Sequence, residues 1–246
     1  MNVFVTGGSR GIGRGIVLKM IQEGNGCAFS YVGNLEAAEE TISLAKEINK
    51  DCKIKAYKMD QSDSKVVEEV VEQAIDDFDS FGALVNNAAI VQDNVVAFMS
   101  DEEWDNVLKT NLYGPFYVSR SFIMHFLSNR FGRIVNISSL SQGGSTGQAN
   151  YAASKAGLVA LSNSISREYG PKKITSNVVV VGYVPTDMTQ NNMSEELRKF
   201  WVTYCPAKRV GEAEEIASAV HYLTTEQAGF ISGETINVTG GFGYAP

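Results

Sequence analysis

A tyrosine and a lysine one helical turn apart are the residues of this chain best suited to acid–base chemistry. Tyr151 and Lys155 belong to the run Tyr-Ala-Ala-Ser-Lys, which we interpret as helical. Side chains at i and i+4 lie on one face of a helix, about 5–6 Å apart at Cβ. A free phenol has a pKa of about 10, and a nearby ammonium lowers it by stabilising the phenolate. The pair is therefore a candidate acid–base catalyst.

Two serines precede this pair at the end of a predicted strand. Ser138 and Ser139 follow the apolar run that begins at Arg133. A serine hydroxyl at a strand end can donate to a carbonyl oxygen as negative charge develops on that oxygen. Together with a phenol and an ammonium, such a serine would suit the reduction of a carbonyl group by a hydride-carrying cofactor.

A glycine-rich turn near the amino terminus predicts where that cofactor binds. Thr6 to Gly13 reads Thr-Gly-Gly-Ser-Arg-Gly-Ile-Gly, after a predicted strand and before a predicted helix. Gly7, Gly11 and Gly13 let the backbone turn tightly and approach a pyrophosphate, whose charge meets the N–H groups at the helix start. In that context the turn indicates a dinucleotide site.

The charges around this site favour NADPH over NADH. An NAD site usually places Asp or Glu at the end of the second strand, where it binds the ribose 2′-hydroxyl. The second strand here ends Ser30-Tyr31-Val32-Gly33-Asn34, without a carboxylate. Arg10, inside the glycine turn, would attract a 2′-phosphate. NADPH is the predicted cofactor.

Short apolar runs alternate with amphipathic stretches along the chain, which indicates repeated βα units on a parallel sheet. We expect helices over Leu35–Asn49 and Ser64–Phe78, with Asp63 and Asp101 as N-caps. The predicted strands are Asn2–Thr6, Gly26–Tyr31, Cys52–Lys58, Ala83–Asn86, Arg133–Ser138, Thr175–Val181 and Thr235–Val238. The predicted fold is α/β: one Rossmann-type doubly wound domain with a seven-stranded, mostly parallel sheet and helices on both faces.

No linker, low-complexity tract or internal repeat divides the sequence, so residues 1–246 are predicted to form a single dinucleotide-binding and catalytic domain. Residues 185–205 are less regular. Such a stretch beside a cofactor site is often a mobile substrate lid. A surface loop with one helix is the alternative.

Composition excludes several other classes of protein. A formal net charge of −7 argues against a nucleic-acid partner. The chain has 3 cysteines without a CxxC spacing and 2 histidines, so no metal site is predicted. No apolar run reaches the length of a membrane span, which is about 18 residues or more. We expect a cytoplasmic protein with no membrane contact.

These motifs resemble those of the short-chain dehydrogenase/reductase family, over essentially the whole chain. The resemblance rests on the glycine turn, on Asn86-Asn87-Ala88-Ala89 and on the Tyr-x-x-x-Lys run. It implies four catalytic residues, which are Asn111, Ser139, Tyr151 and Lys155. In the family, an asparagine like Asn111 can hold a water that links the lysine to solvent.

The family's serine commonly precedes its tyrosine by 13 positions, which is the spacing of Ser138, whereas Ser139 stands 12 positions before Tyr151. We favour Ser139, because a one-residue deletion in the glycine-containing loop is easier to absorb than a change of side at a strand end. Ser138 stays the alternative.

The same resemblance implies the cofactor contacts. Asp60 and Gln61 match the position at which related reductases hold the adenine, and Asn87 and Ala88 match residues expected to touch the cofactor. The full predicted set is Gly7, Gly8, Ser9, Arg10, Gly11, Ile12, Gly13, Ser30, Tyr31, Asn34, Asp60, Gln61, Asn87, Ala88, Tyr151, Lys155, Gly182, Val184 and Thr186.

Within the family, the chain is most similar to the 3-oxoacyl-[acyl-carrier-protein] reductases. The resembling stretches include Asp93-Asn94 and Gly147-Gln148-Ala149-Asn150. They imply reduction of a carrier-linked 3-oxoacyl thioester in fatty-acid or polyketide-type biosynthesis, by a homotetramer. An acyl carrier protein is acidic, and basic residues expected near the site mouth could receive it; these are Arg130, Arg133, Lys172 and Lys173.

Other functions stay open. The enzymatic alternatives are an acetoacetyl-CoA reductase and a reductase or dehydrogenase of a small-molecule ketone, sugar, steroid or quinone. A non-catalytic dinucleotide-binding protein is a further alternative. Val181 and Lys208 stand where the resembled reductases have Pro and Gly, and either change could reshape the substrate pocket.

Overall fold

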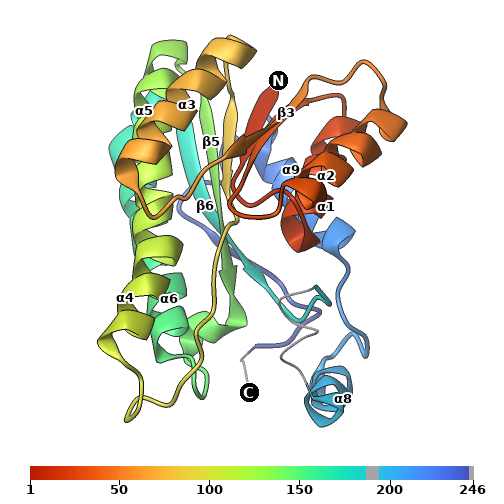
Figure 1. Cartoon of the computed structure of the whole chain (residues 1–246), viewed down its shortest axis with the longest axis vertical. Coiled ribbons are helices and arrows are strands. Elements are labelled where there is room, and N and C mark those ends of the chain that lie inside the picture. The colour runs from red at the N-terminus through yellow and green to blue at the C-terminus, as the bar shows by residue number, and fades with distance from the viewer. Residues whose placement is uncertain (187–193, 244–246) are drawn as a thin grey trace.

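Seven parallel strands form a central sheet between two layers of helices in the computed structural model, which describes residues 1–186 and 194–243 (Figure 1). The strands are β1 Asn2–Val5, β2 Gly26–Tyr31, β3 Ile54–Lys58, β4 Ala83–Asn86, β5 Gly132–Ser139, β6 Ile174–Val181 and β7 Thr235–Val238. Their order is β3-β2-β1-β4-β5-β6-β7, and every pair is parallel. The predicted doubly wound fold is confirmed.

Helices cover both faces of the sheet, as the buried strand residues require. The helices are α1 Gly11–Gln22, α2 Leu35–Ile48, α3 Ser64–Phe78, α4 Asp101–Leu108, α5 Gly114–Asn129, α6 Ala149–Tyr169, α8 Glu195–Tyr204 and α9 Ala213–Thr224. Because successive strand side chains point to opposite faces, Val3 and Val5 join a core under α1, α2 and α9, whereas Phe4 joins a core under α3, α5 and α6. Figure 1 shows the two helix layers on opposite sides.

The strand order reverses between β1 and β4. The chain first builds outward from β1 to β3, and it then returns across β1 to place β4 on the other side. The loops after β1 and β4 therefore leave the carboxyl edge in opposite directions, which opens a crevice between them. This crevice is where a doubly wound fold binds its ligand.

Several predicted boundaries differ from the observed ones. β1 ends at Val5 and β3 begins at Ile54, while β5 and β6 each begin one residue earlier than predicted. Asp63 caps α3 as predicted, since its carboxylate accepts from the N–H of Lys65. The prediction of Asp101 as an N-cap is wrong.

Ser100 caps α4 instead. Its hydroxyl accepts from the N–H of Glu103, and the Glu103 carboxylate accepts from the N–H of Ser100. Two backbone donors are satisfied in this way, whereas Asp101 becomes the first helical residue.

A third, smaller apolar cluster places α8 beside the carboxyl edge. Trp201 of α8 stacks on Tyr183, with ring centres 5.9 Å apart, and also contacts Phe242 at 4.8 Å. The cluster includes Val178 and Val180 of β6. Among the described helices, none is long and apolar enough to cross a membrane.

Candidate active site

A cavity of about 540 Å³ lies at the carboxyl edge, where the strand order reverses. It is lined by the glycine turn, the ends of β2, β4 and β5, the start of α6 and the segment after β6. Of the predicted residues, those that line it are Gly7, Ser9, Arg10, Gly11, Ile12, Gly13, Ser30, Tyr31, Asn34, Asp60, Gln61, Asn87, Ala88, Ser138, Ser139, Tyr151, Lys155, Gly182, Val184 and Thr186. One site thus brings together residues from along most of the chain.

The glycine turn has the backbone that only glycine adopts easily. Gly7 and Gly11 have φ values of +67° and +55°. A side chain at Gly13 would collide with the Gly7 carbonyl oxygen, so the turn also needs glycine for close packing. Gly8, predicted as a cofactor contact, does not line the cavity. A Cβ there would meet Phe29 at 2.5 Å, which makes Gly8 a packing residue under the turn.

Hydrogen bonds hold the turn against the end of β4. Thr6 Oγ1 accepts from the N–H groups of Asn87 and Ala88, both at 3.0 Å. Asn87 Nδ2 donates to the carbonyls of Thr6 at 3.0 Å and Gly7 at 3.1 Å. The Asn-Asn-Ala-Ala motif therefore ties β1 to β4, and it also lines the cavity with Asn87 and Ala88.

The start of α1 can receive an anion. Arg10 is its N-cap residue, and no described side chain caps the helix there. The neighbouring Arg14 is bound within the fold, since its guanidinium donates to the Ser9 carbonyl, to Thr41 and to Glu40. Backbone N–H groups and a helix dipole directed into a cavity fit a dinucleotide pyrophosphate.

The end of β2 carries no carboxylate in the cavity. Tyr31, Val32, Gly33 and Asn34 line this part, and the Asn34 side chain accepts from the N–H of Ala37 to cap α2. Gln61, predicted to hold the adenine, braces the site by donating to the carbonyls of Ala88 and Thr110.

Residues next to the predicted ones complete the lining. Met59, Ala89, Ile90, Thr110 and Ile137 line the cavity, and sequence reasoning did not single them out. Each of these residues lies within two positions of a predicted one. Their closeness in sequence to the predicted residues was the only signal that could have identified them, because such lining residues form no motif of their own.

Tyr151 and Ser139 both line the cavity. Burial raises the pKa of the Tyr151 phenol to about 12, while a hydrogen bond with Ser139 lowers it and the charge of Asp93 raises it. At neutral pH the phenol is therefore protonated, which is the state of a proton donor.

Lys155 lies behind the phenol. Its side-chain nitrogen donates to the carbonyl oxygen of Ile137 at 2.8 Å and lies 5.5 Å from the ring centre of Tyr151. Burial lowers the pKa of the Lys155 ammonium to about 8. A hydrogen bond with Ser139 lowers the phenol pKa here, and the predicted effect of the Lys155 charge on that pKa stays a prediction.

The two candidate serines differ in their partners. Ser138 Oγ donates to Gln142 Oε1 at 2.8 Å and to the Lys155 carbonyl at 3.2 Å, so it is engaged inside the fold. Ser139 Oγ accepts from the N–H of Ser141 at 3.2 Å, and the Ser139 hydroxyl lowers the pKa of the phenol. The geometry favours Ser139.

Asn111 lies in a π-helical turn, Lys109–Tyr113, between α4 and α5. Such turns occur often at functional sites. Asn111 is fully buried, with Oδ1 accepting from the N–H of Ile90 at 2.8 Å and Nδ2 donating to the Ile90 carbonyl at 2.9 Å. It does not line the cavity, so its role in holding a water stays a prediction.

The basic residues expected near the site mouth lie elsewhere. Arg130 precedes β5, and Lys172 and Lys173 precede β6, so all three are at the amino edge of the sheet. β5 is eight residues long, which puts that edge about 25 Å from the cavity. The predicted placement is wrong for a single chain, because the parallel strands carry the site at their other end.

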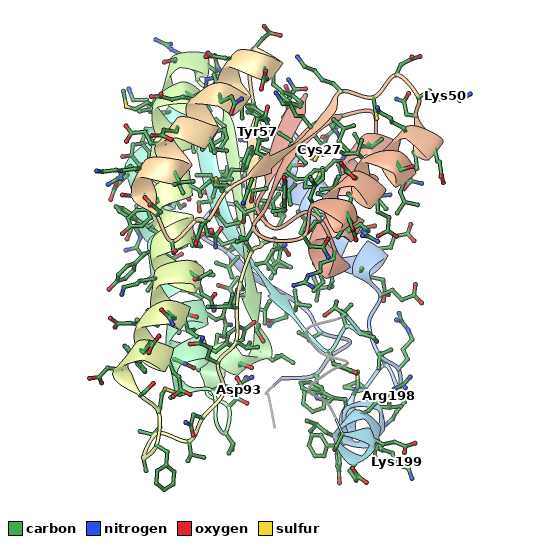
Figure 2. The ribbon with its side chains drawn as sticks, in the orientation of Figure 1. Cys27, Lys50, Tyr57, Asp93, Arg198 and Lys199 are labelled. Atoms are coloured by element: carbon green, nitrogen blue, oxygen red, sulfur yellow. The ribbon has the colours of Figure 1, made fainter. Side chains whose placement is uncertain are left out.

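Arg133 is not a surface residue. It is 4% exposed, and its guanidinium donates to the carbonyls of Thr225, Gly132 and Lys173 at 3.0–3.1 Å. Basic side chains on the carboxyl side include Arg198 and Lys199 of α8, which Figure 2 shows below the strands.

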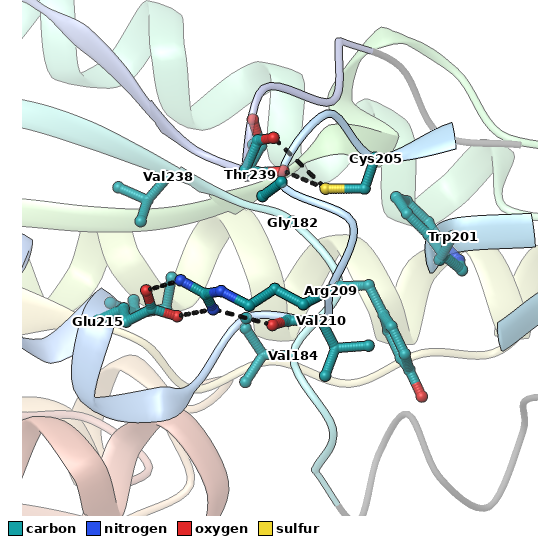
Figure 3. A pocket seen from close by; sticks show the side chains of 14 residues that line it. Gly182, Val184, Trp201, Cys205, Arg209, Val210, Glu215, Val238 and Thr239 are labelled. Atoms are coloured by element: carbon teal, nitrogen blue, oxygen red, sulfur yellow. Dashed lines mark hydrogen bonds and ion pairs between the residues drawn. The ribbon is translucent and has the colours of Figure 1, made fainter. Parts of the chain in front are cut away.

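A small hollow of about 70 Å³ lies beside the cavity, between α8 and the segments that follow β6 and β7 (Figure 3). Cys205 Sγ contacts the carbonyls of Thr239 and Gly240, and Arg209 forms an ion pair with Glu215. The hollow is too small for a dinucleotide. Its residues instead hold the end of α8 against the sheet.

The predicted lid over residues 185–205 is partly described. Residues 187–193 lie outside the described part, and Glu195–Tyr204 forms α8. One helix within a surface segment was the alternative prediction. The helix is confirmed, and motion of a lid stays a prediction.

Comparisons with known proteins agree with this geometry. A family model described as enoyl-(acyl carrier protein) reductase matches residues 7–243. The chain belongs to the short-chain dehydrogenase/reductase family of oxidoreductases, which bind a nicotinamide cofactor. The predicted family is confirmed.

Named relatives cover nearly the whole chain. The 3-oxoacyl-[acyl-carrier-protein] reductase FabG of Staphylococcus aureus is 38% identical over 241 residues, 98% of this chain and 97% of the relative. FabG of Haemophilus influenzae is 37% identical over 238 residues, 96% of each chain. The crystal structure of levodione reductase is similar at a TM-score of 0.93 and 29% identity, covering 98% of this chain and 96% of that one.

Proposed function

We propose that this protein reduces a 3-oxoacyl thioester, carried on an acyl carrier protein, to the 3-hydroxyacyl thioester with NADPH, in fatty-acid or polyketide-type biosynthesis. The observation that carries the proposal is that Tyr151, Ser139 and Lys155 line one dinucleotide-sized cavity, with Lys155 Nζ 5.5 Å from the ring centre of Tyr151. The names of the Staphylococcus aureus and Haemophilus influenzae relatives support the thioester substrate.

Each residue has a defined part in the reaction. The bound cofactor supplies the hydride that the carbonyl carbon receives. Tyr151 gives its hydroxyl proton to the carbonyl oxygen, while Ser139 donates a hydrogen bond to that oxygen as it gains charge. The Lys155 cation stabilises the phenolate that remains, and Asn111 holds a water through which solvent returns the proton.

NADPH is the proposed cofactor because of the charges around the adenosine end of the cavity. Arg10, Tyr31 and Asn34 line the same cavity, and the end of β2 offers no carboxylate to repel a 2′-phosphate. The glycine turn, with Gly7, Gly11 and Gly13, would hold the pyrophosphate against the start of α1.

The test is oxidation of NADPH, followed by its loss of absorbance, with acetoacetyl thioesters of a carrier protein and of coenzyme A. We expect turnover of the carrier-linked substrate, and its loss in Tyr151→Phe with NADPH binding retained. The similarity to levodione reductase favours a free ketone as the second candidate. A panel of free ketones in the same assay separates the two, and turnover of ketones alone would exclude the thioester proposal.

We also propose a homotetramer. Large apolar side chains are exposed on α4 and α5, with Trp104 at 39%, Phe116 at 43% and Met124 at 69%. Light scattering coupled to size-exclusion chromatography should give the mass of four chains; the mass of one chain would exclude this proposal. The cytoplasmic location stays a prediction from the sequence.

A further inference from the structure

A chain of hydrogen bonds links an exposed carboxylate to the catalytic serine. Gln148 Nε2 donates to both carboxylate oxygens of Asp93, at 3.2 and 3.1 Å, and Gln148 Oε1 accepts from Ser141 Oγ at 2.9 Å. The backbone N–H of Ser141 then donates to Ser139 Oγ at 3.2 Å. We call these four residues, Asp93, Gln148, Ser141 and Ser139, the positioning chain. Figure 2 shows Asp93 on the carboxyl side of the sheet, where the cavity lies.

Asp93 fixes the direction of the hydrogen bonds that the Gln148 amide makes. A carboxylate only accepts, so the Gln148 amide must turn its NH₂ group toward Asp93 and its oxygen toward Ser141. The Ser141 hydroxyl then has to donate. A flipped amide would put its oxygen against the Asp93 carboxylate and lose that contact, so one orientation of Gln148 is strongly preferred.

The consequence reaches Ser139. Ser141 belongs to the short 3₁₀ turn Leu140–Gly143 that follows β5, and the bond to Gln148 holds that turn. The backbone N–H of Ser141 donates to a lone pair of Ser139 Oγ. The Ser139 hydroxyl hydrogen is therefore available for an acceptor in the cavity. That is the polarity needed to stabilise a carbonyl oxygen.

Further hydrogen bonds hold together the two loops that carry the positioning chain. Asn94 N–H donates to the Gly147 carbonyl at 2.8 Å. Asn150 Nδ2 donates to the carbonyls of Gln92 at 2.9 Å and Glu103 at 3.1 Å. The loop after β4 is thereby fastened to the first turn of α6, which carries Tyr151.

We propose that Asp93 and Gln148 are positioning residues for the reduction, and that they act by keeping the Ser139 hydroxyl aimed as a donor into the cavity. This inference rests on the proposed reductase function. Among the described residues, neither of the two lines the cofactor cavity, so their effect falls on turnover and not on cofactor affinity.

The first experiment is a double-mutant cycle on the turnover rate. Gln148→Ala should lower kcat about tenfold or more, with the KM for NADPH and the melting temperature nearly unchanged. In a Ser139→Ala background the same change should cost less than about twofold, because residues that act through one group are not additive. An equal loss in both backgrounds would show that Gln148 does not act through Ser139, and would overturn the proposal.

The second experiment exchanges the two functional groups. Gln148→Glu alone sets two carboxylates against each other and should lower kcat as much as Gln148→Ala. Adding Asp93→Asn supplies an amide that donates to the new carboxylate, which can still accept from Ser141. We expect kcat to return to within about threefold of wild type. No recovery in a variant that folds and binds NADPH would also overturn the proposal.

A matched control and the choice of substrate keep the results interpretable. Asp77 is an acid on α3 that accepts a hydrogen bond from Tyr57, far from the cavity, so Asp77→Asn should leave kcat unchanged. All ratios are measured with whichever carbonyl compound wild type reduces fastest. Failure of the thioester proposal then appears in the wild-type substrate panel, whereas failure of the positioning chain appears only in the variant ratios.

Discussion

Lys155 and Tyr151 stand one turn apart on α6, yet the lysine bonds to the Ile137 carbonyl at 2.8 Å and only its charge faces the phenol ring, 5.5 Å away. Burial shifts the two pKa values in opposite directions. It lowers the pKa of Lys155 to about 8 and raises the pKa of Tyr151 to about 12. At neutral pH the phenol keeps its proton while the lysine keeps its charge. This combination suits a group that donates a proton and then needs its anion stabilised.

The rate of reduction should therefore fall as the pH rises through about 8. Above that value Lys155 loses the charge that stabilises the Tyr151 phenolate. The measurement is kcat for NADPH-dependent reduction between about pH 6 and 10. Lys155→Arg keeps its positive charge over this whole pH range. We expect the variant to be slower than wild type, but its rate should not fall with pH. A wild-type rate that does not change up to about pH 9.5 would contradict the role of the Lys155 charge.

The same burial should make folding stability depend on pH. The pKa of Lys155 is about 8 in the folded chain against 10.5 ordinarily. The unfolded chain binds more protons between these values, so the cost of the buried charge is full below the lower pKa and vanishes above the higher one. Lys155→Met removes this cost. The free energy of unfolding of the variant minus that of wild type should therefore be about 3 kcal/mol larger at pH 7 than at pH 10.5.

Urea denaturation at the two pH values measures this difference. Lys199→Met serves as the control, because Lys199 is exposed on α8 and its removal should shift stability equally at both pH values. A Lys155→Met effect that does not change with pH would mean that the ammonium is solvated in the folded protein.

Cofactor preference should depend on Arg10. Replacing Arg10 with Glu puts a negative charge in the part of the cavity proposed for the 2′-phosphate. A lost charge-assisted hydrogen bond costs about 1.5–3 kcal/mol, so kcat/KM for NADPH should fall about 10- to 100-fold while that for NADH changes little. Arg14→Gln, a change at a neighbouring arginine bound to the fold, should not alter the ratio. An unchanged ratio in Arg10→Glu would remove Arg10 from the cofactor site.

Local spacing was sufficient to predict the glycine turn and the Tyr151–Lys155 pair, because each is set by one turn of backbone. The partner of Lys155 could not be predicted, since the Ile137 carbonyl comes from a strand 18 residues earlier. The N-cap at Ser100 was within reach: Glu103, three residues on, completes a capping box that Asp101 lacks.

Arg133 shows a limit of a different kind. The sequence predicted Arg133 as one of the basic residues near the site mouth, but its carbonyl partners at Thr225 and Lys173 lie 92 and 40 positions away. Only the assembled sheet brings them together. The docking prediction for Arg133 fails for this reason, because its burial depends on distant parts of the chain.

Arg133→Ala should therefore act on stability. It leaves one buried carbonyl and two part-buried carbonyls without this donor, at a cost of about 2–4 kcal/mol. Arg130→Ala, at an exposed neighbour on the same edge, should change the unfolding free energy by less than about 0.5 kcal/mol. Chemical denaturation measures both. Loss of activity toward a carrier-linked substrate in Arg133→Ala without loss of stability would restore a docking role.

Lys208 occupies a left-handed backbone conformation, with φ at +56°, where the resembled reductases have glycine. This conformation costs an L-residue about 1–2 kcal/mol. Glycine avoids that cost, but it loses more conformational entropy on folding, which offsets part of the gain. Lys208→Gly should consequently raise the unfolding free energy by about 0.5–1 kcal/mol and the melting temperature by about 2 °C. The bond from Lys208 Nζ to the Thr203 carbonyl is exposed, so its loss costs little. Lys208→Ala loses the same bond but keeps the strain, and it should show no gain; equal stabilities of the two variants would mean that the backbone there is unstrained.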